Sequence, residues 1–204
     1  RDKKIWIFNA GNAFDGNPKW LFMYIVNYRK DITPYWFCYT EETRNYIRKL
    51  GYQAFLFKSK MAEKIGSQAG VYVVNQKKEV FQDYLKGITV LNLWHGVGCK
   101  TVEKGVTYGF LNERIIKKHI INMDCYQNYQ LFLVTSPLME KHFIKQCDLA
   151  EDKIIRAGYP CCFYPGKIKT YDHDILKQKK LPEDTKIAVY APTYRDASAT
   201  NFFS

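Results

Sequence analysis

The sequence of 204 residues contains no apolar run long enough to cross a bilayer. Its longest apolar stretches, such as residues 129–134, are interrupted by polar residues well before the roughly 20 residues that a transmembrane helix needs. Its N-terminus lacks the charged segment followed by an apolar segment that is typical of a secretory signal. From these two absences we expect the chain to act in the cytoplasm.

Cysteine patterns that bind zinc are also missing. The six cysteines show none of the paired C-x-x-C spacings of zinc sites. Cys38 and Cys125 lie among apolar and aromatic neighbours, where a thiol behaves as a small hydrophobic group. We therefore expect reduced cysteines, no metal and no cofactor.

Acidic residues are scarce relative to basic ones, which gives a net charge of +11. This excess indicates an anionic partner, which is a nucleic acid, a phosphorylated substrate or an anionic membrane. The aromatic content of 16% is compatible both with stacking on single-stranded nucleic acid and with a lipid interface. No RRM, KH, helix-turn-helix or zinc-finger signature is present, so a nucleic-acid-binding module stays open only as an alternative.

Short β-type runs alternate with helix-type stretches along the chain. Pro18 is typical of a first helical turn, and Gly51 of a helix end. Strands separated by helices of this length form right-handed crossovers in a mostly parallel sheet, so the predicted fold class is α/β. Strands are expected at residues 4–8, 35–39, 53–57, 71–74, 88–93, 130–135 and 153–157, and helices at residues 18–28, 41–50, 59–66, 78–85, 112–122 and 137–146.

The last forty residues differ in character from the rest. Residues 164–185 are polar and rich in lysine, with two prolines and a glycine, and are typical of a linker. Residues 186–190 then predict a new strand. We divide the chain into a domain at residues 1–163, a linker at residues 164–185, and the first strand and loop of a second domain at residues 186–204. Because the rest of that second domain is missing, we expect these 204 residues alone to be inactive.

The sharpest motif is Leu-Trp-His-Gly-Val-Gly-Cys-Lys at residues 93–100, directly after a predicted strand. Ligands of parallel sheets collect at the carboxyl ends of strands. His95 is suited to accept a proton near neutral pH, the glycines permit close approach to a ligand, and Lys100 supplies a positive charge for a phosphate. A single histidine after a strand more often caps or packs, so the motif by itself leaves both interpretations open.

Three further motifs have ordinary structural explanations when each is taken alone. The glycine-rich loop at residues 11–19, Gly-Asn-Ala-Phe-Asp-Gly-Asn-Pro-Lys, is neither a dinucleotide fingerprint nor a P-loop. It can cradle a phosphate or a hydroxyl-rich group, or simply lead into a helix. Gly-Tyr-Pro at residues 158–160 and Ala-Pro-Thr-Tyr-Arg-Asp at residues 191–196 are strand exits, and Arg195 can bind a phosphate with its guanidinium group.

In this order the four motifs resemble those of the CDP-glycerol:glycerophosphotransferases, and the resemblance spans residues 5–196. These enzymes build the poly(glycerol phosphate) and poly(ribitol phosphate) of teichoic acids and related capsules. The resemblance implies a GT-B-like fold of two Rossmann-type domains, with the acceptor and the histidine on the N-terminal one and most of the CDP-alditol site on the other. It departs from the family pattern at Cys161 and Cys162, where Arg-Asn usually follows Gly-Tyr-Pro, and at Val97-Gly98, where Thr-Pro is common.

The resemblance implies transfer of glycerol phosphate or ribitol phosphate from a CDP-alditol to a growing teichoic-acid-like or capsular polymer, with release of CMP. By this interpretation His95 takes the proton of the acceptor hydroxyl, while cations neutralise the reacting phosphate. A GT-B glycosyltransferase that uses a nucleotide-sugar is a second alternative. The residues predicted to bind substrate are Gly96, Val97, Gly98, Cys99, Lys100, Arg195, Asp196, Asn17 and Lys19.

The predicted helix at residues 112–122 separates basic side chains from isoleucines. Such a helix either packs its apolar stripe into the core or lies on an anionic bilayer. Together with the net charge, it leads us to expect a peripheral enzyme at the cytoplasmic face of a bacterial membrane, acting on a lipid-linked or oligomeric polyol-phosphate acceptor. The sequence does not distinguish glycerol from ribitol, primase from polymerase, or wall polymer from capsule.

Overall fold

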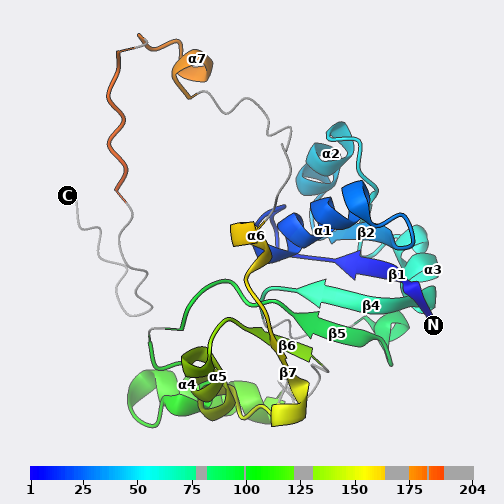
Figure 1. Cartoon of the computed structure of the whole chain (residues 1–204). Helices are drawn as coiled ribbons and strands as arrows, with labels where there is room; N and C mark the ends of the chain where they lie inside the picture. The colour runs from blue at the N-terminus through cyan, green and yellow to red at the C-terminus, as the bar shows by residue number, and fades with distance from the viewer. Residues whose placement is uncertain (77–81, 99, 122–130, 164–174, 183, 191–204) are drawn as a thin grey trace. The chain divides into compact units, whose positions relative to one another are not determined.

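A computed structural model of the chain describes residues 1–76, 82–98, 100–121, 131–163, 175–182 and 184–190. The chain forms two separate units, Arg1–Gly166 and Lys167–Ser204. The first unit contains a seven-stranded sheet in the order β3-β2-β1-β4-β5-β6-β7, in which every pairing is parallel (Figure 1). Its strands are β1 (Asp2–Phe8), β2 (Thr33–Cys38), β3 (Ala54–Leu56), β4 (Ala69–Val74), β5 (Thr89–Asn92), β6 (Leu131–Val134) and β7 (Ile154–Arg156).

Helices connect these strands and begin where the sequence supplies capping side chains. The hydroxyls of Thr40, Ser59 and Ser136 each accept a hydrogen bond from the backbone N–H three residues further on, which satisfies one free donor of the first turn. The α-helices are α1 (Gly16–Tyr28), α2 (Glu41–Lys49), α3 (Lys60–Gln68), α4 (Gly109–Ile121), α5 (Pro137–Cys147), α6 (Pro160–Phe163) and α7 (Ile175–Lys179). Short 3-10 helices are η1 (Asp83–Leu85), η2 (Glu103–Gly105) and η4 (Glu151–Lys153).

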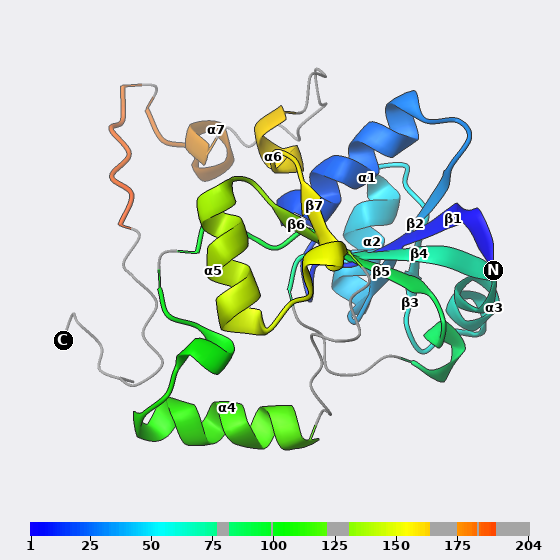
Figure 2. The ribbon, with the colours of Figure 1, turned by 60° about the horizontal axis from the view of Figure 1, so that its bottom comes forward.

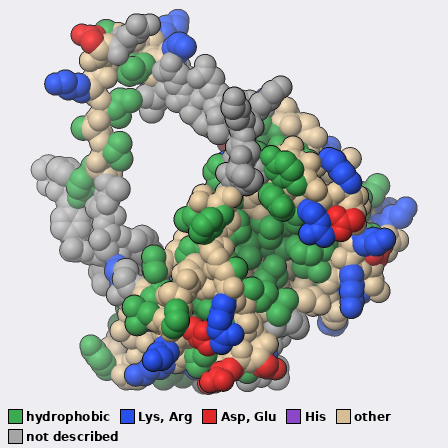
Figure 3. Space-filling view, viewed as in Figure 1, with side chains coloured by type: hydrophobic (Ala, Val, Ile, Leu, Met, Phe, Trp, Pro, Cys, Tyr) green, Lys and Arg blue, Asp and Glu red, His purple; other side chains and the backbone are tan. Residues whose placement is uncertain are grey.

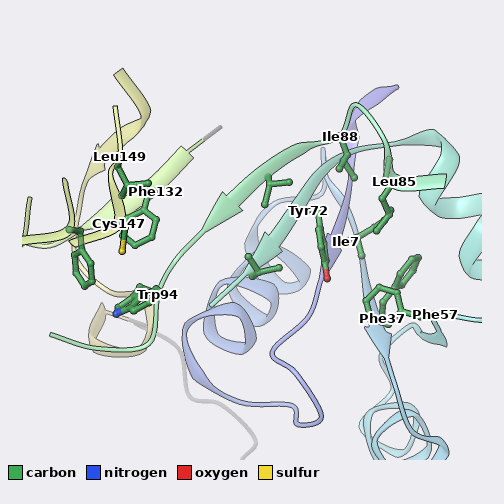
Figure 4. Packing of buried hydrophobic residues seen from close by; sticks show 14 of the residues in the cluster. Ile7, Phe37, Phe57, Tyr72, Leu85, Ile88, Trp94, Phe132, Cys147 and Leu149 are labelled. Atoms are coloured by element: carbon green, nitrogen blue, oxygen red, sulfur yellow. The ribbon is translucent and has the colours of Figure 1, made fainter. Parts of the chain in front are cut away.

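The alternation of side chains along the strands gives the sheet two cores. On one face, Phe8 of β1 and Trp36 of β2 pack against Phe22 of α1, with ring centroids 5.4 and 5.7 Å from that of Phe22. On the other face, Ile7 and Phe37 belong to a larger cluster with residues of α3 and α5 (Figure 4). α4 and α5 lie across the sheet from α1 and α2 (Figures 1 and 2). The face drawn in Figure 3 exposes hydrophobic side chains over its middle.

The seven strands predicted for residues 1–163 are confirmed, with ends that differ by at most two residues. The predicted helix at residues 78–85 is wrong in its described part, which is only the 3-10 turn η1; residues 78–81 lie outside the described residues. Tertiary packing explains the difference. Leu85 is buried, and the hydroxyl of Tyr84 donates to the carbonyl of Phe57 at 2.7 Å, which bends the chain toward the sheet.

The C-terminal predictions also need correction. The segment predicted as a linker, residues 164–185, contains the five-residue helix α7. The strand predicted at residues 186–190 is wrong, because these residues are exposed and no described strand pairs with them. A strand needs a partner for its N–H and C=O groups, and alternating hydrophobic residues alone do not provide one. The assignment of residues 186–204 to a second domain stays a prediction.

The carboxyl ends of all seven strands meet at one edge of the sheet. The chain order reverses there between β1 and β4, since β2 and β3 lie on one side of β1 and β4 to β7 on the other. Open α/β sheets bind ligands at such a switch point. The loops after β1 and β5, which contain two of the motifs, therefore lie at the edge where a site is expected.

Candidate functional site

The loop at residues 93–100 leaves β5 with a sharp change of direction. The N–H of Leu93 donates to the carbonyl of Val74 at 2.7 Å, which extends the ladder one residue beyond β5. Trp94 then adopts a φ of 53°, in the left-handed region that bulky residues rarely occupy. Its indole is buried against Phe132 and Phe143, with ring centroids 5.6 and 5.2 Å away (Figure 4). This turn places Trp94 inside the core and leaves His95 exposed.

The imidazole of His95 is held on two sides. Its Nδ1 lies 2.9 Å from the carbonyl oxygen of Asn75, the residue that follows β4, and its ring stacks on Trp94 with centroids 4.4 Å apart. A carbonyl oxygen can only accept, so Nδ1 carries the hydrogen of the neutral ring and Nε2 is left with a free lone pair. The same carbonyl would also stabilise the imidazolium that forms after proton uptake. His95 therefore has the tautomer of a general base.

A cavity of about 150 Å³ opens beside this histidine. Pockets for whole drug-sized ligands usually measure about 300–1,000 Å³, so this cavity has room for one group of a ligand and not for a whole one. His95 and Lys100 are its titratable side chains. It is lined by Trp94, His95, Gly96, Val97, Gly98, Lys100, Val102 and Phe143.

Four of the residues predicted to bind substrate thus line the cavity: Gly96, Val97, Gly98 and Lys100. Gly98 has a structural reason to be glycine, since a Cβ there would lie 2.5 Å from Nε2 of His142 on α5. Its N–H donates to Sδ of Met139 at 3.2 Å and so is already engaged within the protein. A Cβ on Gly96, by contrast, would meet no atom within 4 Å, so the cavity side of that residue is open. Cys99 lies outside the described residues.

The two residues predicted from the glycine-rich loop have other roles in the structure. Asn17 is 2% exposed, and its side-chain amide donates to the carbonyls of Leu93 and Trp94 at 3.3 and 2.9 Å. The ammonium group of Lys19 lies over the rings of Phe14 and Trp20, 5.6 and 5.2 Å from their centroids. The prediction that Asn17 contacts substrate is therefore wrong, because the side chain is buried beneath the His95 loop.

The Gly-Tyr-Pro turn also reaches this loop. The hydroxyl of Tyr159 donates to the carbonyl of Gly96 at 2.6 Å, and burial raises the pKa of Tyr159. The N–H of Cys161 donates to Oδ1 of Asn17 at 3.4 Å. Cys161 and Cys162 are exposed with their sulfurs 3.8 Å apart, and partial burial raises the pKa of the Cys161 thiol. Hydrogen bonds between residues 63 to 144 positions apart thus join three of the motifs.

Residues of the fourth motif cannot be placed, because Arg195 and Asp196 lie outside the described residues. Within the described ranges, no three His, Cys, Asp or Glu side chains come together as a group that could hold a metal ion. The basic side chain that lines the cavity in the described residues, besides His95, is Lys100, and its binding of phosphate stays a prediction.

Sequence reasoning missed the asparagines that support the site. The buried polar residues of the described chain include Asn75 after β4 and Asn92 at the end of β5. Oδ1 of Asn92 accepts the N–H of Trp94 at 2.8 Å, while the backbone carbonyl of Asn75 holds His95. A signal was present, since each asparagine interrupts an apolar run where a strand ends.

Sheet order and switch point together define a Rossmann-type α/β domain, with the candidate site around His95 at its carboxyl edge. The family model described as CDP-Glycerol:Poly(glycerophosphate) glycerophosphotransferase matches residues 1–204, and the chain belongs to this family. The family suggested by the four motifs is thereby confirmed. A search of curated proteins finds no match.

Solved structures of the wall teichoic acid polymerase TagF have a similar fold. One, TagF itself, superposes with a TM-score of 0.69 at 20% identity, covering 95% of this chain and 48% of TagF. Another, a histidine-to-asparagine variant soaked with CDPG, gives a TM-score of 0.70 at 20% identity with the same coverage. The chain thus spans about half the length of these structures. The likeness confirms the predicted fold class, α/β with a GT-B-like, Rossmann-type parallel sheet.

Proposed function

We propose that this chain supplies the acceptor side and the general base of an enzyme that transfers an alditol phosphate from a CDP-alditol to a teichoic-acid-like or capsular polymer. Family membership supports glycerol phosphate as the transferred group and CDP-glycerol as the donor. The observation that carries the proposal is the hydrogen bond between Nδ1 of His95 and the carbonyl of Asn75, which leaves Nε2 as the basic nitrogen of a side chain that lines the cavity. CDP-ribitol is the other donor of this kind.

In the proposed reaction an acceptor hydroxyl oxygen bonds to the β-phosphorus of the CDP-alditol. The bond from that phosphorus to the oxygen shared with the α-phosphate breaks, and CMP leaves with that oxygen. The proton of the hydroxyl goes to Nε2 of His95. Lys100 at the cavity and Arg195, as predicted from the sequence, neutralise the phosphate groups, and Asp196 stays a predicted substrate-binding residue. The step uses no cofactor, since the CDP-alditol is itself a substrate.

The size of the cavity is consistent with a site that holds only the reacting part of the donor. A volume of about 150 Å³ holds the reacting phosphate and polyol, while a whole CDP-alditol needs additional surface. We propose that the nucleotide is bound by residues outside the described first unit. Lys100 can then neutralise the phosphate while His95 takes the proton, so that positioning and charge provide most of the catalysis.

We further propose that the enzyme meets a lipid-linked acceptor at the cytoplasmic face of an anionic membrane. The described residues contain no helix long and apolar enough to span a bilayer. On and beside α4, Tyr108, Phe110 and Ile116 are exposed, as are Arg114 and Lys117. An exposed helix that combines aromatic, aliphatic and basic side chains is suited to a bilayer surface.

A donor assay tests the proposed function. The enzyme that carries these residues is incubated with an oligomeric glycerol phosphate or ribitol phosphate acceptor and, separately, with CDP-glycerol, CDP-ribitol or UDP-sugars. We expect CMP release that depends on the acceptor. Release of UDP instead would identify a GT-B glycosyltransferase, and binding of oligonucleotides without either release would favour the nucleic-acid alternative.

A further inference from the structure

We propose that Asn17 and Tyr159 are positioning residues that hold His95 in its base-competent orientation. This inference rests on the proposed role of His95 but concerns side chains that do not touch the cavity. Asn17 lies beneath the loop, and its Nδ2 donates to the carbonyls of Leu93 and Trp94, the two residues before His95. Tyr159 donates to the carbonyl of Gly96, the residue after it. The backbone on both sides of His95 is thus fixed from distant parts of the chain.

The turn between these two contacts needs such support. The left-handed conformation of Trp94 costs energy for a residue with a Cβ, and it persists only where the surroundings enforce it. Here both polar groups of the Trp94 backbone are engaged by buried side chains. Its N–H donates to Oδ1 of Asn92 at 2.8 Å, and its carbonyl accepts from Asn17 at 2.9 Å. The energetic cost of the turn is therefore offset by hydrogen bonds to buried side chains.

The conformation of Trp94 determines what His95 can reach. With φ at 53°, the chain turns so that the imidazole stacks on the indole and its Nδ1 meets the carbonyl of Asn75. If Trp94 relaxed to an ordinary conformation, His95 would point elsewhere and lose that acceptor. Both neutral tautomers of the imidazole would then be populated. Asn17 and Tyr159 thus control the position of the Nε2 lone pair without contacting the substrate.

Asn17 also links its own contact with the His95 loop to the segment that carries Tyr159. Its Oδ1 accepts the N–H of Cys161, two residues beyond Tyr159, at 3.4 Å. One buried amide therefore joins the start of α1, the His95 loop and the Gly-Tyr-Pro turn. Because an amide has both donors and an acceptor, neither aspartate nor leucine can make all three contacts. This requirement explains why asparagine occupies the position.

The test measures the His95 tautomer directly, by nitrogen NMR of the 204-residue chain labelled in its four histidines. His95→Ala identifies the signal. In the unsubstituted chain we expect a protonated Nδ1 and an unprotonated Nε2 in the neutral form. Tyr159→Phe removes one hydroxyl, and Asn17→Asp removes the amide donor at nearly constant volume. In both variants we expect the signal to shift toward a mixture of tautomers.

Matched controls separate positioning from general stability. Tyr84→Phe removes a hydroxyl that donates to the carbonyl of Phe57, and Asn9→Asp changes an equally buried amide that bonds to Gly11 and Phe37. Neither should change the His95 signal, even if both lower the melting temperature. If the Tyr159 and Asn17 variants lose stability like the controls but keep the His95 tautomer, their role is structural and the proposal is wrong.

Kinetics of the enzyme that carries this chain provide the second measurement. We expect Tyr159→Phe and Asn17→Asp to lower kcat by up to about 100-fold with little change in KM, since misplacing a reacting group by about 1 Å has an effect of this size. A loss confined to KM would contradict the proposal. If His95→Ala itself retains turnover, the proposed base is wrong, whereas the tautomer measurement still decides whether the two residues orient the ring.

Discussion

The side chain of His95 is exposed, fixed through Nδ1 and placed at a cavity, and each of these facts bears on substitution. We expect His95→Ala to abolish alditol-phosphate transfer in the enzyme, with a loss of roughly 10²–10⁴-fold that is typical for a general base. Because the ring is exposed, circular dichroism and melting temperature should stay close to those of the unsubstituted protein. Turnover at the original rate would show that another group takes the proton.

The buried hydroxyl of Tyr159 should make the stability of the protein depend on pH in the alkaline range. Burial raises its pKa above the usual value near 10, so the folded state favours the neutral phenol. Its contribution to stability is therefore complete below that value and is lost as the pH rises through the raised pKa. At neutral pH we expect Tyr159→Phe to be less stable by about 0.5–1.5 kcal/mol, the contribution of one hydrogen bond. In urea titrations the difference in unfolding free energy between the two proteins should shrink above about pH 10. A difference that stays constant with pH would contradict this prediction.

Individual residues also show how far sequence reasoning reaches. His95 was predicted as the base from the resemblance of four motifs, since its local features alone left a capping or packing role open, and the structure places it at a cavity. Asn17 was interpreted as a substrate ligand because loops after strands commonly bind ligands. Its burial depends on contacts with Leu93 and with Cys161, 144 residues away. Contacts of this kind leave no trace in the local pattern.

At the scale of elements, the approach of β4 to β1 depends on one glycine. A Cβ on Gly70 would lie 2.6 Å from the carbonyl oxygen of Asp2 and 2.7 Å from Cα of Lys3, where the register between the strands is irregular. Backbone atoms cannot yield as side chains can, so we expect Gly70→Ala to destabilise the protein by at least about 1–3 kcal/mol in urea titrations. Gly96→Ala, with open space around its Cβ, is the control for stability and should cost much less.

Elements were predictable where local signals agree with packing. Ser59 and Ser136 cap helices that begin within a residue of their predicted starts, and the apolar strands of the sheet are recovered in order. The exceptions are segments whose conformation depends on distant partners. η1 replaces part of a helix because Leu85 and Tyr84 turn toward the sheet, and residues 186–190 form no strand because no described strand pairs with them.

At the scale of the whole molecule, the net charge of +11 and the exposed face of α4 predict binding to anionic vesicles. Each basic residue near a bilayer contributes about 1 kcal/mol, so the double variant Arg114→Glu, Lys117→Glu should weaken vesicle binding by at least about tenfold. The variant Lys60→Glu, Lys64→Glu makes the same charge change on exposed residues of α3 and is the control. Sedimentation with vesicles of phosphatidylglycerol and phosphatidylcholine measures both. Equal losses of vesicle binding in the two double variants would indicate that the net charge of the protein, and not the face of α4, determines binding.

The buried asparagines at the carboxyl edge have a consequence for how the enzyme responds to acidity. Asn17, Asn75 and Asn92 neither gain nor lose a proton at any pH at which the protein is folded, and the raised pKa of Tyr159 moves its ionisation further into the alkaline range. The supports of His95 described here therefore keep one charge state throughout the neutral range. A pH–rate profile measured there reports the reacting groups themselves and not a loosening of these supports.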